Sequence, residues 1–229
     1  MSPKKRKYRA SPLRRSQSPG YLGRTILVVT EGGKTEPIYL CGLRGRLKLN
    51  AADIHIINAP GTDALTVVEE AISLRDQRKR EVKHGCTVPF DSAWAVFDSE
   101  RADNNPRLHN ALQLARSREI SVALSNPCFE FWILLHDKYT TAPFINCAEV
   151  ISRIKAEFNP GYKKNDPAVS AYLPKIQIAV RNSERCRIHH VTSGSDGNPS
   201  TGVDLLVREM NDATRPHFRL DLNAISERS

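Results

Sequence analysis

Acidic side chains follow three segments of the chain that are predicted to be buried β-strands. Glu31 follows the first segment, Asp98 and Glu100 follow the third, and Asn126 and Glu130 follow the fourth. In an open parallel α/β sheet, functional residues gather at the carboxyl ends of the strands. Carboxylates that converge there could hold Mg²⁺, which prefers oxygen ligands and can activate water for attack on a phosphodiester.

The spacing of these acids refines the prediction. Asp98 and Glu100 are two residues apart, so they share one side of an extended segment. Glu130 lies in the otherwise apolar stretch 126–136, as a further ligand or base, or as a buried acid paired with Arg or Lys. We predict Glu31, Asp98 and Glu100 as metal ligands and catalytic residues, with Glu130 as a fourth catalytic residue. The alternative is that they are solvated loop acids, which are common.

A glycine-rich turn at residues 32–35 could contact a phosphate. A nucleoside triphosphate loop ending at Lys34 would need Gly at position 28, where the chain has Val28, so the loop is too short. Backbone N–H groups and Lys34 could still bind a single phosphate at a helix start, and we predict Lys34 as a phosphate-binding residue. Alternatively, the glycines only permit a tight turn. The polar loop with Lys163 and Lys164 either reaches phosphate or is a surface turn.

Strands and helices alternate over the first part of the chain. The predicted strands are 25–30, 53–58, 92–97 and 120–125. Helices are predicted to begin at Thr35, at Thr62 or Asp63, and near Leu108. This order is typical of a parallel sheet with helices on its faces, and we predict the α/β class. Further on, mainly helices are expected, at about 147–158, 170–188 and 200–212.

The charge divides the chain. Eight of the basic residues that give the net charge of +9 lie in residues 1–24, where no acid occurs, so the remainder carries +1. A basic arm can bind nucleic-acid phosphates through counterion release, or it can be a solvated leader. We predict three parts: a disordered tail at 1–23, an α/β core at 24–136 and a mainly helical C-terminal extension at 137–229.

The cysteines and the hydropathy of the chain indicate the cellular compartment of the protein. The five cysteines form no C-x-x-C pair, so reduced thiols are expected in place of disulfides or a zinc ribbon. No apolar run approaches the roughly 18 residues that span a bilayer, and the N-terminus lacks the apolar region of a secretory signal. These features predict a cytoplasmic protein with no membrane partner.

Four segments carry a resemblance to a known family. TILVVTEGGKTEPIYL, WAVFDSE, ALSNPCFEFWILLH and NPSTGVDLLV are similar to the RloB family, which is classed with Toprim-like domains and found near restriction loci with an AAA/ABC-type ATPase partner. The resemblance implies a Toprim-like (Rossmann-like) fold with a Glu after the first strand and D-x-D after the third. Glu31 and Asp98 match this pattern, whereas Glu100 replaces the second Asp and lengthens that arm by one methylene.

Three functional hypotheses follow from the residues and the resemblance. The favoured one is a nuclease dependent on Mg²⁺ or Mn²⁺, which cleaves RNA or DNA in anti-phage defence (abortive infection) under the control of an ATPase partner. The second is a catalytically idle module that binds nucleic acid or a partner. The third is a nucleotide-signal sensor at residues 32–35.

Overall fold

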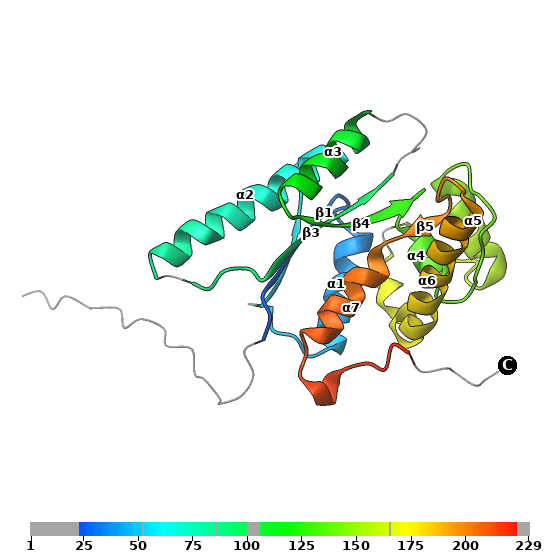
Figure 1. The fold of residues 1–229 in the computed structure, drawn as a ribbon. Helices are drawn as coiled ribbons and strands as arrows, with labels where there is room; N and C mark the ends of the chain where they lie inside the picture. Colours follow the sequence, from blue (N-terminus) through cyan, green and yellow to red (C-terminus); the bar gives the residue numbers. More distant parts are fainter. Residues whose placement is uncertain (1–22, 52, 86, 100–105, 165, 224–229) are drawn as a thin grey trace, which may run out of the picture.

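The computed structural model describes residues 23–51, 53–85, 87–99, 106–164 and 166–223. Nearly all of the predicted basic tail lies outside these residues. Within them, one sheet separates two layers of helices (Figure 1). No helix in the described ranges is long and apolar enough to cross a membrane.

The sheet has five strands in the order β2-β1-β3-β4-β5. The strands are β1 (Ile26–Thr30), β2 (Ile54–Asn58), β3 (Ser92–Asp98), β4 (Ser121–Asn126) and β5 (Ser200–Thr201). β1 to β4 are parallel, and β5 is antiparallel to β4. All five residues of β1 are buried, which explains why Ile26–Val29 is a continuous apolar run instead of an alternating one.

Helices cover both faces of the sheet. They are α1 (Thr35–Arg46), α2 (Ala64–Lys83), α3 (Pro106–Ser117), α4 (Glu130–Leu134), α5 (Cys147–Glu157), α6 (Ile176–Ser193) and α7 (Val203–Asp212), with the 3₁₀ helices η1 (Pro167–Lys175) and η2 (Pro216–Phe218). α2 and α3 lie on one face, and α1 and α4–α7 form the layer on the other (Figure 1).

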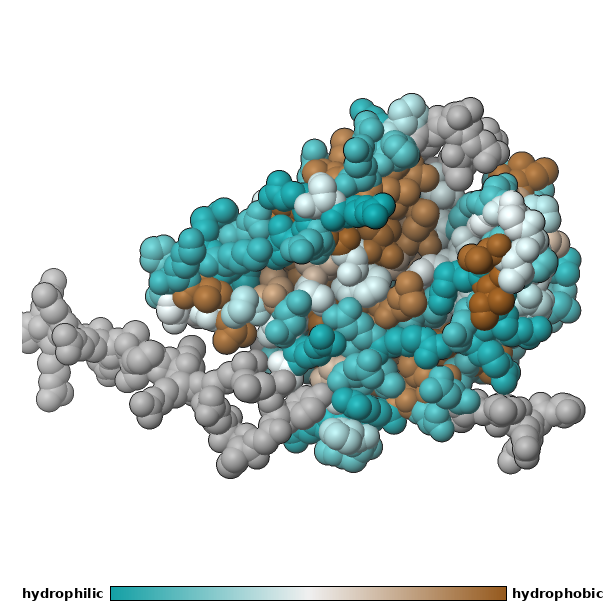
Figure 2. Space-filling view, in the orientation of Figure 1, coloured by the Kyte–Doolittle hydropathy of each residue, from teal (hydrophilic) through white to brown (hydrophobic). Residues whose placement is uncertain are grey.

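The two faces have separate cores because side chains alternate along a strand. Leu27 and Val29 of β1 pack with α2 and α3, whereas Ile26 and Val28 pack with α1 and the helices after β4. The α2–α3 layer leaves some of its face open, and Figure 2 shows apolar surface beside α3. The larger core joins residues before and after position 136 in one cluster.

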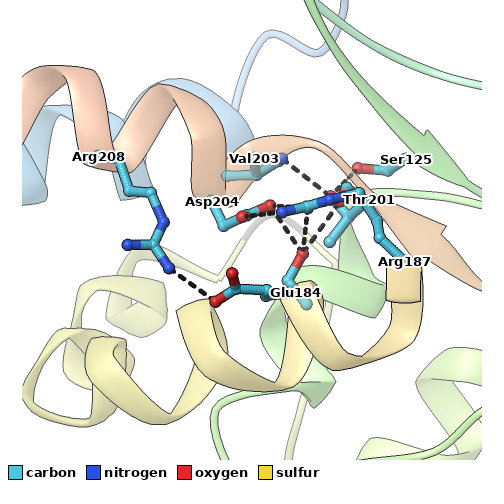
Figure 3. Close-up of polar contacts among 8 residues, drawn as sticks. Ser125, Glu184, Arg187, Thr201, Val203, Asp204 and Arg208 are labelled. Atoms are coloured by element: carbon cyan, nitrogen blue, oxygen red, sulfur yellow. Dashed lines mark hydrogen bonds and ion pairs between the residues drawn. The ribbon is translucent and has the colours of Figure 1, made fainter. Parts of the chain in front are cut away.

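An ion pair with a buried carboxylate and a partly exposed guanidinium holds the C-terminal elements to the sheet (Figure 3). Asp204 of α7 is 0% exposed and accepts hydrogen bonds from both Nη atoms of Arg187 on α6. The Nη2 atom lies 2.6 Å from Oδ2. Ser183 donates to Asp204 Oδ1 at 2.8 Å, and Arg187 Nη1 donates to the carbonyl of Thr201 at 3.1 Å. The Thr201 hydroxyl shares a hydrogen bond with Ser125 at 2.9 Å. α6, α7, β5 and β4 are therefore linked through one polar network.

The structure confirms the α/β class and the mostly parallel sheet, with corrections in the last third. Residues 200–201 form a strand and not a helix start, because they pair with β4 and Gly202 lies close to the β4 backbone. The helix expected at about 170–188 is two elements, η1 with Pro174 inside it and then α6, which continues to Ser193.

The cysteine prediction is wrong for one pair. Cys128 and Cys147 form a disulfide, with Cα atoms 5.6 Å apart. Tertiary packing of the start of α5 against the β4–α4 turn brings them together, and no local motif signals this. Cys41 and Cys186 carry free thiols, and Cys86 lies outside the described residues.

Candidate acidic site at the carboxyl edge of the sheet

Two of the predicted acids meet because β1 and β3 are neighbours. The register pairs Thr30 with Val96, so both strands end at the same edge. The backbone N–H of Glu31 donates to the carbonyl of Val96 at 2.9 Å. In return, the backbone N–H of Asp98 donates to Glu31 Oε2 at 3.0 Å. The Glu31 carboxylate therefore lies against the end of β3.

The β4–α4 turn brings a third contact to Asp98. The backbone N–H of Phe129 donates to Asp98 Oδ1 at 2.8 Å. The side chain of Asn126 is engaged elsewhere, since it accepts from the Ser99 hydroxyl at 3.0 Å and donates to the Gly197 carbonyl at 3.3 Å. Asn126 therefore supports the loops beside the site, and Phe129 positions the Asp98 carboxylate.

Glu36 is a further acid of the cluster, although it was not among the residues predicted for the site. It lies in the first turn of α1 and is buried. Desolvation raises its pKa, a backbone hydrogen bond opposes this, and the charge of Glu130 adds to the increase. The sequence signal that could have identified Glu36 is its place as the last acid of the E-G-x-K-T-E string, in the first turn of α1.

Glu130 is the most deeply buried acid of the cluster, at 0% exposed. Its Oε1 accepts no hydrogen bond from the described residues, and its Oε2 lies 3.8 Å from Lys164 Nζ. Desolvation raises the pKa of Glu130, and Lys164 acts in the opposite direction. Glu130 was predicted either as a further ligand or base or as a buried acid paired with Arg or Lys. The structure places it both beside the other acids and near Lys164.

Charge repulsion within the cluster is strongest at Asp98. Burial, followed by the charges of Glu36, Glu130 and Glu31, raises the pKa of Asp98 well above its ordinary value. Partial burial lowers the pKa of Lys164, but the four carboxylates outweigh this effect and raise it. The site therefore favours an added positive charge, because a nearby cation stabilises the ionised form of each acid.

The family comparison covers this whole arrangement. The model of the RloB-like protein family matches residues 26–210, from β1 into α7. The chain belongs to the RloB-like protein family. No curated protein and no solved structure matches it. All five charged residues of the site, Glu31, Glu36, Asp98, Glu130 and Lys164, lie inside the segment that matches the RloB-like family.

Two further predicted residues of this RloB-like chain are not seen beside the acids in the described structure. Glu100 lies outside the described residues. Lys34 is exposed at the N-cap of α1, where its side chain makes no capping hydrogen bond. Lys163 is also exposed, whereas the next residue, Lys164, approaches Glu130. Of the two lysines in this polar loop, only Lys164 is seen beside the acids in the described structure.

Gly32 gives the RloB-like site a sensitive test. A Cβ atom at this position would overlap the carboxylate of Glu36, so we expect Gly32→Ala to displace Glu36. The clash meets only the end of the Glu36 side chain, so the expected loss of unfolding free energy is smaller than the roughly 1–3 kcal/mol of core overpacking. For the metal site that is proposed below, we also expect Mn²⁺ affinity, measured by titration calorimetry, to fall at least about 10-fold, as when a supporting residue of a metal site is removed.

The neighbouring glycine is the matched control. A Cβ on Gly33 would meet only Asn58 Nδ2, at an ordinary contact distance of 3.6 Å. Gly33→Ala should therefore retain both stability and Mn²⁺ affinity. Equal behaviour of the two variants would show that Gly32 has no specific role beside Glu36.

Proposed function

We propose that this chain is a nuclease dependent on Mg²⁺ or Mn²⁺, with its catalytic site at the acidic cluster. The observation that carries the proposal is that Asp98, at the end of β3, lies against Glu31 and the β4–α4 turn and feels the charges of Glu36, Glu130 and Glu31. Hard carboxylate oxygens are the donor set that these cations prefer, and they rarely gather without a cation or basic partners.

The residues fit such a cation on two grounds. Oε1 of Glu130 is buried and accepts no hydrogen bond from the described residues, so it remains available as a ligand. Burial is the largest cause of the raised pKa values of Asp98, Glu36 and Glu130, and neighbouring carboxylates add to the increase at Asp98 and Glu36. Leaving buried charge uncompensated is costly, which makes the binding of a cation favourable.

In this mechanism the carboxylates hold the metal and the lysines contact the substrate. Asp98 and Glu130 are metal ligands, with Glu36 as an added candidate and Glu31 as ligand or general base. The cation supplies Lewis-acid stabilisation of the phosphodiester and activates water. Phe129 N–H keeps Asp98 oriented. Lys164, half exposed beside the cluster, stabilises negative charge on the phosphate, and Lys34 does so from the adjoining turn.

The wider role is part of the same proposal. We infer that the substrate is RNA or DNA and that an AAA/ABC-type ATPase partner controls cleavage in anti-phage defence. Membership of the RloB-like family supports this inference through the family's association with restriction loci. The basic residues at 1–24 would add affinity for phosphates that is not sequence-specific and weakens with salt.

Cleavage of a mixed panel tests the proposal. RNA and DNA substrates, single- and double-stranded, are incubated with the full chain and Mg²⁺ or Mn²⁺, with and without a co-expressed ATPase partner. Cutting that EDTA abolishes and added metal restores is the expected result. If no substrate is cut under any of these conditions, the nuclease proposal is wrong, and the binding module is supported instead.

Metal binding is tested separately from activity. At a metal concentration of about 100 times Kd, a ligand that binds only the folded state stabilises it by about 2.7 kcal/mol. For a chain of this length that corresponds to a rise in Tm of about 5–10 °C. Differential scanning fluorimetry with Mg²⁺, against NaCl of equal ionic strength, measures this rise. An equal Tm in both salts would contradict a metal site at the cluster.

A further inference from the structure

Two sulfur atoms lie against the carboxylate of Glu130. Oε2 of Glu130 is 3.1 Å from Sγ of Cys147, which is bonded to Cys128. One ligand atom from each of the three residues lies within 4.8 Å of the other two. A disulfide sulfur carries no proton, so this close contact is not a hydrogen bond in the oxidised protein.

Cys128 and Glu130 are buried, Cys147 is partly exposed, and the Glu130 carboxylate lacks a full set of partners. Cys128 is 2% exposed and Glu130 is 0% exposed. Oε1 of Glu130 receives no hydrogen bond from the described residues, and Lys164 Nζ is 3.8 Å from Oε2 on a side chain that is half exposed. Reduction would place one buried and one partly exposed thiol beside this carboxylate, where a cation would relieve the unfavourable burial of charge.

The segments that carry the three groups are held in place. Cys128 and Glu130 flank Phe129, whose N–H binds Asp98. Cys147 is the first residue of α5, and the start of that helix is capped from both sides: Asn146 accepts from the N–H of Glu149 at 3.2 Å, and Glu149 accepts from the N–H of Ile145 at 2.8 Å. This cap fixes the start of α5. Val150 and Ile154 of that helix are buried in the core beside α4, which keeps Cys147 close to the β4–α4 turn without the disulfide.

We propose that, after reduction of the disulfide, Cys128, Cys147 and Glu130 bind a thiophilic divalent cation of the zinc class. A dithiol reductant supplies two electrons and two protons to the S–S bond and is itself oxidised to a disulfide. The cation then displaces the two thiol protons. Two thiolates and a carboxylate are standard zinc ligands, and three protein ligands leave a fourth position for solvent.

This site is distinct from the proposed Mg²⁺ site but shares Glu130 with it. Oε2 is the oxygen that faces the sulfurs, and Oε1 is the oxygen without a partner. The thiolates select a soft cation, and the all-oxygen cluster selects a hard one. The inference does not depend on nuclease activity.

Cobalt is the spectroscopic probe for the experiment. The full chain is reduced with a dithiol, desalted under inert gas and titrated with Co²⁺, with a thiol count before titration to verify reduction. We expect a thiolate-to-cobalt charge-transfer band that saturates at one Co²⁺ per chain and disappears when Zn²⁺ is added. The oxidised wild-type protein should give no band, so the two states of one protein carry the test even where a variant does not fold.

Variants assign the band to its ligands. Cys147→Ser should abolish it, whereas Cys41→Ser, which removes an exposed free thiol, should retain it. Asp98→Asn should also retain it, which separates this site from the Mg²⁺ site. Absence of the band in fully reduced wild-type protein, or its persistence in folded Cys147→Ser, would overturn the proposal.

Discussion

Asp98→Asn is expected to abolish metal-dependent cleavage and, at the same time, to stabilise the metal-free protein at neutral pH. Loss of an outer-shell partner already costs a metal site about 10–100-fold, so removal of a ligand should reduce kcat/KM by more than about 100-fold. The gain in stability arises because burial and three neighbouring carboxylates disfavour the charge of Asp98. Cleavage assays and urea unfolding measure the two effects.

The pH dependence of this gain follows from the direction of the pKa shift. Because the pKa of Asp98 is raised in the folded state, the ionised side chain destabilises the wild-type protein above that pKa. As the pH falls through the folded-state pKa toward the unfolded value of 3.8, the wild-type protein takes up the proton and regains this stability. The advantage of Asp98→Asn should therefore be largest near neutral pH and vanish in acid.

A control variant separates these effects from the loss of any acid. Glu69 is exposed on α2, and Glu69→Gln makes the same change from carboxylate to amide. It should leave cleavage and unfolding free energy unchanged. If Asp98→Asn destabilises the metal-free protein at neutral pH, the description of the cluster as electrostatically repulsive is wrong.

Arg187→Met is expected to cause the largest loss of stability. It leaves Asp204, a fully buried carboxylate, without its guanidinium partner. Breaking one side of a buried ion pair typically costs about 3–5 kcal/mol. For a chain of this length the Tm should fall by on the order of 10 °C. Thermal unfolding followed by circular dichroism measures the change.

A second Arg–carboxylate pair in the same view is the control (Figure 3). Arg208 contacts Glu184 at 3.0 Å, but the Glu184 side chain is half exposed. Exposed pairs contribute about 0–1 kcal/mol, so Arg208→Met should shift the Tm little. The double variant Arg187→Met with Asp204→Leu should recover part of the stability, because it removes the unpaired charge. Similar losses from Arg187→Met and Arg208→Met would show that burial of Asp204 does not govern the effect.

The sequence predicted the parts of the molecule that depend on local pattern. The apolar run 25–30 and the alternation of strands and helices gave the layered sheet, and Glu31 and Asp98 were placed at one edge because parallel strands end together. Glu36 was not found, because a first-turn acid is usually solvated and its burial depends on Gly32 packing over it. Neither the Cys128–Cys147 bond nor β5 has a local signal, since both come from tertiary packing.

The order of the site residues along the chain has a consequence for biosynthesis. Glu31 and Glu36 leave the ribosome early, Asp98 and Glu130 follow, and Lys164 comes later still. The network at Asp204, which holds α6 and α7 to the sheet, involves residues near the end of the matched segment. A nascent chain therefore carries an incomplete cluster until Lys164 has been added. For the proposed nuclease, this arrangement delays activity until the residues up to Asp204 have been translated.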